Sequence, residues 1–246
     1  MKIGIIGGSG LDDPDILKDA VEKRVETKFG AADLSVGKIR DQEIFLIARH
    51  GKGHVLSPGS VNYRANIAAL KDMGADCALA TTACGSLREE VAPGDFVIVD
   101  QFIDFTKKRA HTFFESFENG VAHTPMADPF DSRLRAALIA ASRELSYKIH
   151  KKGTVVTIEG PRFSTRAESL MFRSWGADII NMSVATEAAL ANEAGIPYAA
   201  VAMSTDYDCW KDDEEPVSWD RILEIFNDNA QRVKTLLIQT IERLAL

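Results

Sequence analysis

Seven short apolar runs rich in β-branched residues recur along the chain and predict buried strands. Several of them lack the alternation of apolar and polar positions that marks a half-exposed strand, which indicates burial on both faces. The runs are Ile3–Ile6, Ile44–Ala48, Cys77–Thr81, Phe96–Val99, Thr154–Ile158, Ile179–Asn181 and Tyr198–Met203.

Helical patterns lie between these runs. Asp131 is a candidate N-cap, and Thr165 with Glu168 has the spacing of a capping box. Gly195 is a helix-ending residue, with Pro197 just beyond it. The alternation of strands and helices predicts an α/β layered domain with a mixed sheet. The predicted helices are Ser60–Met73, Asp131–Leu145, Thr165–Trp175, Glu187–Ala194 and a C-terminal helix with an apolar stripe from Ile222 to Ile241.

Two segments break this rhythm. Asp104–Phe130 has no regular period but carries five phenylalanines and two histidines. A long irregular segment in a compact domain is usually functional or disordered, and the aromatic side chains favour a contact, for example with another subunit. The acidic run Asp212–Glu215 is typical of a solvated loop, with a lid over a pocket as the alternative.

Composition narrows the function classes. The 246 residues are 46% hydrophobic and 26% charged, as in ordinary globular proteins. The net charge of -7, without a basic block, gives no support for nucleic-acid binding. No apolar stretch is long enough to cross a membrane, and no signal segment precedes the first strand, so we expect a cytoplasmic protein. Three cysteines without Cys-x-x-Cys spacing indicate neither a disulfide framework nor a metal site.

A glycine-rich turn, Gly7-Gly8-Ser9-Gly10, follows the first predicted strand. A dinucleotide-binding fingerprint starting at Gly8 would need glycine at Asp13, and no Walker-type Gly-Lys-Ser/Thr follows. Backbone N–H groups in such a turn suit a small anion, and the Ser9 hydroxyl adds a donor. A merely tight strand-to-helix turn is the alternative.

Two more strand ends carry groups compatible with an anion. Arg49-His50-Gly51 follows one predicted strand, and Thr81–Ser86 continues from the next. Each group alone has a structural explanation, such as a surface ion pair for Arg49 or a turn for Thr82. Ligands collect at the carboxyl ends of strands in open α/β sheets, so these loops are expected to converge. Arginine then supplies a planar fork that matches phosphate oxygens.

Later strand ends add groups suited to a base and a sugar. Phe163 could stack on a planar base, although such a residue is more often core. Met182 could pack against a sugar, with ordinary packing as the alternative. Asp206 and Asp208 come directly after a buried strand, where carboxylates are costly unless they bind something. A carboxyl group suits the N7 and amino edge of adenine, whereas asparagine would suit a 6-oxopurine better.

With these motifs in place, the chain resembles the 5′-methylthioadenosine phosphorylases of the trimeric purine nucleoside phosphorylase superfamily. The resemblance extends from Ile3 to the last helix, and two of its motifs, Thr-Thr-Ala-Cys-Gly-Ser-Leu-Arg and Thr-Asp-Tyr-Asp-Cys-Trp, are distinctive. The motifs are Gly7–Leu11, Arg49-His50-Gly51 with His54, Asn62–Asn66, Thr81–Glu90, Glu159–Ser164, Asn181–Ser183 and Thr205–Trp210.

The resemblance implies one domain over residues 1–246, with a mixed, partly barrel-like sheet flanked by helices in three layers, assembled as a homotrimer. It implies a nucleoside substrate, phosphate as co-substrate, and neither a metal nor an organic cofactor. It implies catalytic roles for Asp206 and Asp208. It further implies phosphate ligands at Ser9, Arg49, His50, Thr82 and Ser183, base and ribose contacts at Ala83, Phe163, Ser164, Met182, Asp206 and Asp208, and a 5′-group pocket at His123, Trp219 and Leu223.

Some positions depart from the family pattern. Ser9 and Ser183 stand where the animal enzymes have threonine, and either hydroxyl can bond phosphate. Trp219 stands where a smaller apolar residue is expected near the 5′ substituent, which leaves the size of that pocket open. The alternatives are a phosphorylase of 6-oxopurine nucleosides, a hydrolytic nucleosidase and a non-catalytic nucleotide-binding sensor.

Overall fold

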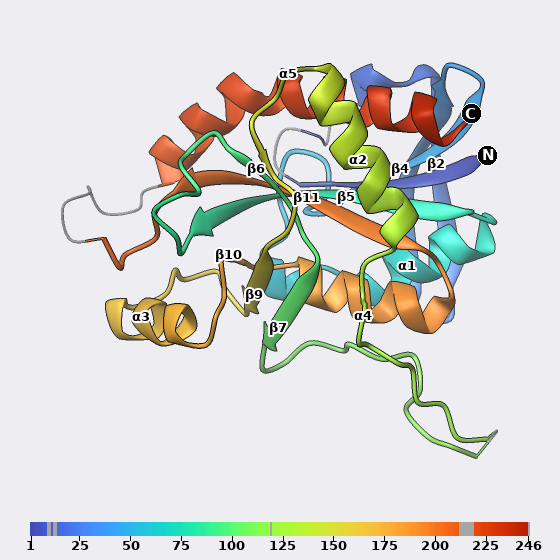
Figure 1. Cartoon of the computed structure of the whole chain (residues 1–246). Coiled ribbons are helices and arrows are strands. Elements are labelled where there is room, and N and C mark those ends of the chain that lie inside the picture. The colour runs from blue at the N-terminus through green and yellow to red at the C-terminus, as the bar shows by residue number, and fades with distance from the viewer. Residues whose placement is uncertain (9–10, 12–13, 119, 212–218, 246) are drawn as a thin grey trace.

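One mixed sheet organises the protein. The computed structural model describes residues 1–8, 11, 14–118, 120–211 and 219–245, except for the side chains of residues 14, 219–224 and 226–228. In this part of the chain eleven strands join in one sheet, with helices on both of its faces (Figure 1). The predicted α/β fold with a mixed sheet is confirmed.

Four parallel strands form the centre of the sheet. They are β1 (Lys2–Gly7), β4 (Gln42–Ala48), β5 (Cys77–Ser86) and β11 (Tyr198–Asp206). β1 lies between β4 and β5, and β11 pairs with the other edge of β5. These strands coincide with four of the predicted apolar runs, because burial on both faces requires nearly continuous apolar sequence.

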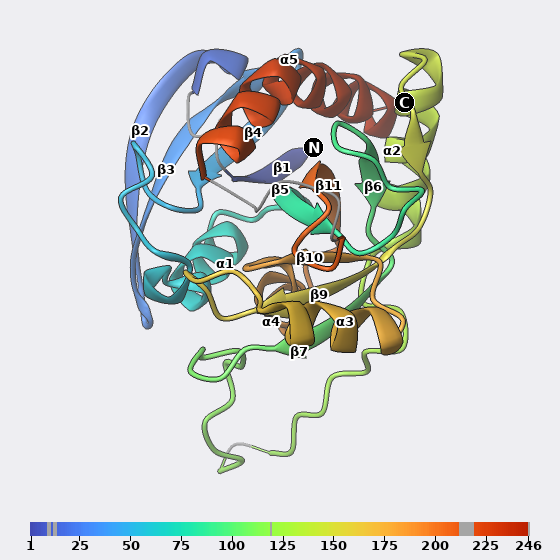
Figure 2. The same cartoon turned by 90° about the vertical axis from the view of Figure 1, so that its left-hand side faces the viewer.

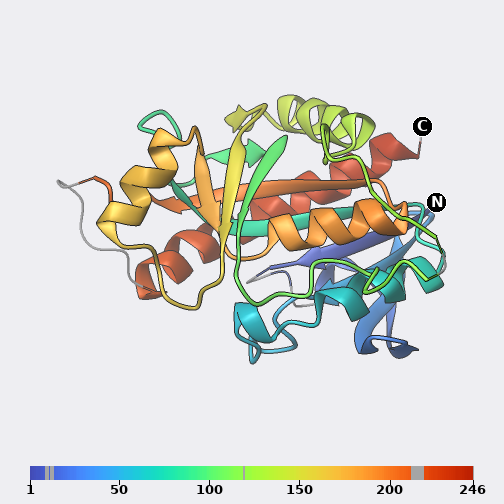
Figure 3. The same cartoon turned by 90° about the horizontal axis from the view of Figure 1, so that it is seen from below.

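Two pairs of helices cover this centre. Figure 1 shows α2 (Ser132–Glu144) and α5 (Trp219–Leu244) above the β1–β5–β11 layer, and α1 (Tyr63–Asp72) and α4 (Val184–Ala194) below it. The view from below, in Figure 3, places α4 across β5 and β11.

The side chains of β1 divide between the two faces of the sheet. Ile3 and Ile5 belong to the core cluster that contains residues of α2 and α5, whereas Ile6 belongs to the cluster that contains residues of α1 and α4. All three isoleucine side chains are fully buried. A strand with both faces covered in this way is stabilised mainly by apolar burial, about 25 cal/mol per Å².

The sheet divides beyond the centre and curves, as Figure 2 shows. On one branch β10 (Ile179–Asn181) pairs antiparallel with the end of β5, and β9 (Thr154–Ile158) and β7 (Gln101–Phe105) follow. On the other branch β6 (Phe96–Ile98) pairs with β11, and β8 (Ile149–His150) pairs with β6. Helix α3 (Arg166–Ser174) packs beside β9 and β10 over a small separate core.

The sequence patterns did not reveal four strands: β2 (Lys18–Thr27), β3 (Gly30–Ile39), β7 and β8. The strands β2 and β3 form a long antiparallel hairpin that carries the sheet outward from β4. Most positions of β2 are exposed, so its sequence carries charged residues where a buried strand carries apolar ones. Charged side chains on an edge strand also oppose pairing with other chains.

The predicted helix ends are confirmed in detail. The Asp131 side chain accepts from Leu134 N–H, and Thr165 with Glu168 forms the complete capping box. Gly195 ends α4 in the left-handed region at φ 67°, where glycine carries no Cβ penalty. Two boundaries differ. Ser60 ends a 3-10 turn, η2 (Pro58–Ser60), ahead of α1, and α4 begins at Val184, three residues earlier than predicted.

An irregular arm follows β7. The predicted irregular segment Asp104–Phe130 starts two residues too early, because Asp104 and Phe105 pair within β7. Between residues 106 and 130 the described residues contain neither helix nor strand, and the chain extends away from the body of the protein (Figures 1 and 2). Phe114, Phe117 and Val121 are 40%, 48% and 72% exposed on this arm. The predicted acidic loop Asp212–Glu215 lies outside the described residues.

The described residues contain neither a candidate membrane span nor a candidate metal-binding cluster. None of the helices found there is long and apolar enough to cross a membrane. The same residues contain no group of three or more His, Cys, Asp or Glu side chains placed to hold a metal ion. A further short 3-10 turn, η1 (Pro14–Ile16), joins the first loop to β2.

Candidate active site

One pocket collects ten of the predicted site residues. It lies at the carboxyl ends of the central strands, the usual ligand position in an open α/β sheet. Its remaining walls include Gly8, His54, Pro58, Asn181 and Thr205. The ten residues are Arg49, His50, Thr82, Ala83, Phe163, Ser164, Met182, Ser183, Asp206 and Asp208.

The division of the sheet at β5 creates this pocket. The first half of β5, Cys77–Ala80, pairs with β1, whereas Gly85 and Ser86 pair with β10. No partner strand in the described part of the chain covers Thr81–Cys84 on that edge. The sequence predicted Thr81–Ser86 as a loop and Asp206 as beyond its strand; both predictions are wrong, because β5 and β11 continue pairing as far as Gly85 and Asp206.

Arg49 forms a buried polar contact set at the end of β4. Its side chain is 1% exposed and forms an ion pair with Glu187 through Nε and through Nη2, the latter 2.9 Å from Oε2. Nη1 donates to Thr81 O at 2.8 Å. Burial lowers the Arg49 pKa, but the Glu187 carboxylate outweighs burial and raises it, so the guanidinium stays charged.

His50 contributes a neutral ring. Its Nδ1 lies 2.9 Å from Leu56 O, and because a carbonyl oxygen only accepts, Nδ1 carries the hydrogen. Burial and the neighbouring Arg49 lower the pKa of His50 to about 4. Nε2 of the neutral ring is therefore a hydrogen-bond acceptor. The ring stacks on His54, with the centroids 4.3 Å apart.

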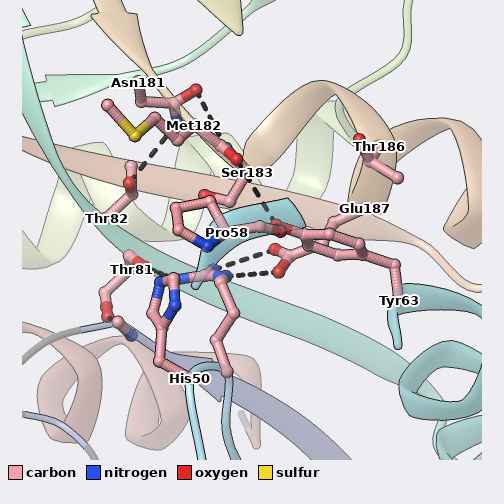
Figure 4. Close-up of polar contacts among 12 residues, drawn as sticks. His50, Pro58, Tyr63, Thr81, Thr82, Asn181, Met182, Ser183, Thr186 and Glu187 are labelled. Atoms are coloured by element: carbon pink, nitrogen blue, oxygen red, sulfur yellow. Dashed lines mark hydrogen bonds and ion pairs between the residues drawn. The ribbon is translucent and has the colours of Figure 1, made fainter. Parts of the chain in front are cut away.

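Hydroxyl groups and a helix N-terminus complete this half of the pocket. Thr82 and Ser183 are 7% and 4% exposed, and both line the pocket (Figure 4). Ser183 is the N-cap of α4, and its side chain makes no capping bond to the first turn. Because α4 begins at Val184, its N-terminus meets the pocket, where the helix dipole favours an anion. A cation, hydroxyls and a helix end together suit a phosphate group.

The opposite half holds the two carboxyl groups. Asp206 Oδ1 accepts the Asp208 N–H at 2.7 Å, and Oδ2 accepts the Thr205 hydroxyl at 2.7 Å. The Ser164 hydroxyl lies 2.9 and 2.7 Å from the two oxygens of Asp208. Burial raises the Asp208 pKa, against the lowering effect of the Ser164 hydrogen bond. Acidic groups held this way can accept hydrogen bonds from a base or exchange a proton with it.

Apolar groups line the space near both halves. Phe163 remains 40% exposed, so its ring is available to a ligand rather than part of the core. The Met182 side chain lies against Gly160: a Cβ at Gly160 would approach the Met182 sulfur to 2.4 Å, and the backbone there has φ +66°. Glycine at 160 therefore lets the thioether occupy this wall of the pocket. Ala83, half-buried within β5, also lines the pocket.

The described residues do not place the other four predicted site residues in the pocket. Ser9 and the side chains of Trp219 and Leu223 lie outside the described residues. His123 lies on the arm, with its ring 5.4 Å from that of Phe117, and is not among the residues that line the pocket of its own chain.

Sequence reasoning missed the buried partners of the pocket residues. Glu187 was predicted only as the start of a helix, yet it binds Arg49 and accepts the Tyr198 hydroxyl at 2.7 Å. Thr81 O binds Arg49, and Asn181 Nδ2 lies 3.4 Å from the Thr82 hydroxyl. The only signal was a carboxylate four residues after Ser183 in a stretch of mainly small and apolar residues. A buried acid of this kind needs a partner.

Comparisons with known proteins show the family of this chain. The chain matches the model of the Phosphorylase superfamily over residues 2–242. It is 55% identical over 251 residues to the S-methyl-5′-thioadenosine phosphorylase of Xenopus tropicalis, covering 100% of this chain and 89% of the relative.

Two solved structures from Schistosoma mansoni share the fold. One is methylthioadenosine phosphorylase in complex with adenine, at a TM-score of 0.95 and 44% identity over 100% of this chain and 92% of that one. The other is a single-residue variant of adenosine/methylthioadenosine phosphorylase in complex with methylthioadenosine, at a TM-score of 0.94 and 42% identity over the same shares. The chain therefore belongs to the phosphorylase superfamily and, within it, to the S-methyl-5′-thioadenosine phosphorylase family.

Proposed function

We propose that this protein cleaves 5′-methylthioadenosine with phosphate, releasing adenine and 5-methylthioribose 1-phosphate, a step of purine and methionine salvage. The observation that carries the proposal is the pairing, in one pocket, of groups suited to phosphate with two carboxyl groups suited to a 6-aminopurine. The relatives named S-methyl-5′-thioadenosine phosphorylase support the same reaction.

In the proposed reaction a phosphate oxygen forms a bond to C1′ while the bond from C1′ to N9 of adenine breaks. The electron pair of that bond leaves with adenine, which also takes up the proton that hydrogen phosphate gives up. Positive charge develops on the sugar, and the bound phosphate stabilises it at close range. Nε2 of His50, a lone-pair acceptor, is suited to hold the hydroxyl of hydrogen phosphate. No metal or organic cofactor is needed for these steps.

The leaving base is stabilised at the other end of the pocket. As the bond breaks, N7 of adenine gains basicity and hydrogen-bonds or takes a proton. Asp206 then accepts from N7–H and from the amino group. Asp208 and Ser164 stand beside Asp206, and Phe163 offers a face for stacking. Met182, next to Ser183, is assigned to the ribose.

One assay tests the reaction against its alternatives: adenine release from methylthioadenosine with and without phosphate, beside the same measurement on inosine. We expect phosphate-dependent release and strong preference for methylthioadenosine. Release without phosphate would instead indicate a hydrolytic nucleosidase. Preference for inosine would indicate a 6-oxopurine phosphorylase, and binding without any release a nucleotide sensor.

We also propose that the protein is a homotrimer in which the arm of residues 106–130 crosses to a neighbour. Exposed phenylalanines and a valine on an arm extending from the body suit burial against a second copy. His123 lies on this arm, outside the pocket of its own chain, which leaves it available to close the 5′ end of a neighbour's pocket. The number three follows from the family resemblance.

Light scattering tests the assembly, with an expected mass of about three times 27.0 kDa. His123→Ala should raise the KM for methylthioadenosine while the assembly stays intact, because only the shared pocket loses a contact. Val121→Ser, which removes one of the exposed apolar groups of the arm, should instead weaken the assembly. A fully active monomer would contradict both the trimer and the shared pocket.

A further inference from the structure

Arg49 has more donors than its protein partners use. A guanidinium carries five N–H hydrogens in a rigid fork. Glu187 accepts hydrogen bonds from Nε and from Nη2, and Thr81 O accepts one from Nη1. Among the described residues the two remaining N–H hydrogens, one on each terminal nitrogen, have no protein partner. Gly8 and Arg49 both line the pocket. A Cβ added at Gly8 would lie 3.0 Å from Arg49 Nη1, so this end of the fork faces the pocket beside Gly8.

Glu187 determines how that fork is turned. Both of its oxygens bind the same edge of the guanidinium, which fixes the plane of the fork as well as its position. Tyr198, fully buried in β11, donates to Oε2 at 2.7 Å and holds the carboxylate in turn. The Glu187 side chain is 2% exposed, so water does not compete for these bonds.

The position of Glu187 in the chain adds to this arrangement. It lies in the first turn of α4, the helix whose N-terminus and N-cap Ser183 meet the pocket. One helix end therefore carries a hydroxyl toward the anion and a carboxylate toward the arginine that binds the anion. Figure 4 shows Ser183 and Glu187 from the start of α4 together with His50, which follows β4.

We propose that Glu187 is a positioning residue for phosphate: by holding one edge of Arg49, it aims the two remaining N–H groups of the guanidinium into the pocket. The proposal rests on the proposed function, in which that pocket half binds the phosphate co-substrate. Glu187 itself does not touch the substrates. Its effect is expected on phosphate and not on the nucleoside, whose base half lies at Asp206 and Asp208.

The test compares Glu187→Gln with a matched variant, Glu159→Gln. Glu159 also pairs with a buried arginine, Arg109, but neither residue lines the pocket. In Glu187→Gln the amide NH₂ meets an arginine N–H, so one of the paired bonds is lost and the fork turns. We expect the KM for phosphate to rise about tenfold to a hundredfold, with the KM for methylthioadenosine and the kcat at saturating phosphate within about twofold.

Glu159→Gln controls for lost stability. It should lower the melting temperature while leaving the KM for phosphate within about twofold, because neither Glu159 nor Arg109 lines the pocket and neither binds Arg49. Glu187→Asp keeps the charge but withdraws it by one methylene group, and should give an intermediate rise in the KM for phosphate. Should Glu187→Gln fail to fold, Glu187→Asp decides the question alone.

Direct titration of phosphate into the free enzyme by calorimetry separates this proposal from the proposed reaction. Weaker phosphate binding by the Glu187 variants supports the positioning role whichever reaction follows. Unchanged phosphate binding in Glu187→Asp, or an equal rise in the KM of both substrates, would overturn it and leave Glu187 as a structural counter-charge. Wild-type protein that releases adenine without phosphate would refute the reaction, not the ion-pair role.

Discussion

Replacing Asp206 by Asn should change the choice of base more than it changes the fold. The Asp208 N–H, 2.7 Å from Oδ1, requires an oxygen at that position, so the amide nitrogen is placed at Oδ2. There it meets the Thr205 hydroxyl, which can accept from the amide because it has a second acceptor of its own, Cys84 O at 3.2 Å. The substitution is therefore accommodated without an unpaired buried group.

The expected magnitude follows from the lost carboxylate. When adenine leaves, N7 and the amino group both present hydrogens, and only a carboxylate accepts both. Losing a charge-assisted hydrogen bond costs about 1.5–3 kcal/mol, a factor of about 10 to 150. With a 6-oxopurine the wild-type carboxylate faces O6, lone pair against charge, and a mismatch of this kind can discriminate by several orders of magnitude.

The assay is kcat/KM for methylthioadenosine and methylthioinosine, with phosphate saturating, for wild type and Asp206→Asn. We expect the wild type to prefer methylthioadenosine strongly. The variant's kcat/KM for methylthioadenosine should fall about 10- to 150-fold. Its kcat/KM for methylthioinosine should rise relative to its kcat/KM for methylthioadenosine, since an amide donates to O6. Thr82→Val, on the phosphate side, is the control that should not alter base preference. Equal turnover of both nucleosides by the wild type would refute the assignment of Asp206.

Three further outcomes are expected. Gly160→Ala adds a Cβ 2.4 Å from the Met182 sulfur, at a residue whose backbone φ is +66°. It should raise the KM for the nucleoside and leave the KM for phosphate unchanged. An equal rise in both KM values would contradict the placement of Met182. Thr165→Ala removes the capping box of α3 and should cost about 1 kcal/mol in urea unfolding, with Ser174→Ala at the other end of the helix as a smaller reference. Burial and Arg49 lower the His50 pKa to about 4, so the unfolded chain binds a proton before the folded one as pH falls from about 6.5. Between pH 6.5 and 4.5 the free energy of unfolding of the wild type should therefore fall more than that of His50→Gln. Parallel curves of unfolding free energy against pH would refute the buried neutral ring.

The sequence alone predicted the central strands, the helix ends at Asp131, Thr165 and Gly195, and ten residues that share the pocket. The reason is local. Strands buried on both faces, such as β1 and β11, need continuous apolar runs, and helix ends need particular residues, such as Thr165 and Gly195. Motifs at strand ends converge because parallel strands end at one edge of the sheet. The specific roles came from resemblance to a family, not from these patterns.

Only the tertiary structure decided the rest. Strand β2 carries no apolar signal, because most of its side chains are exposed and pairing with β3 holds it in place. Strand β3 buries Ala32, Leu34 and Ile39, but small and polar residues between them break the apolar run. The opening of the pocket along β5 depends on where β1 ends and β10 begins, which is a property of pairing between distant segments. Glu187 and Arg49 are 138 residues apart in sequence, and their contact exists only because the fold brings the first turn of α4 to the end of β4. Long-range contacts of this kind leave no periodicity in the chain, so the groups that aim the phosphate ligands became visible only in the fold.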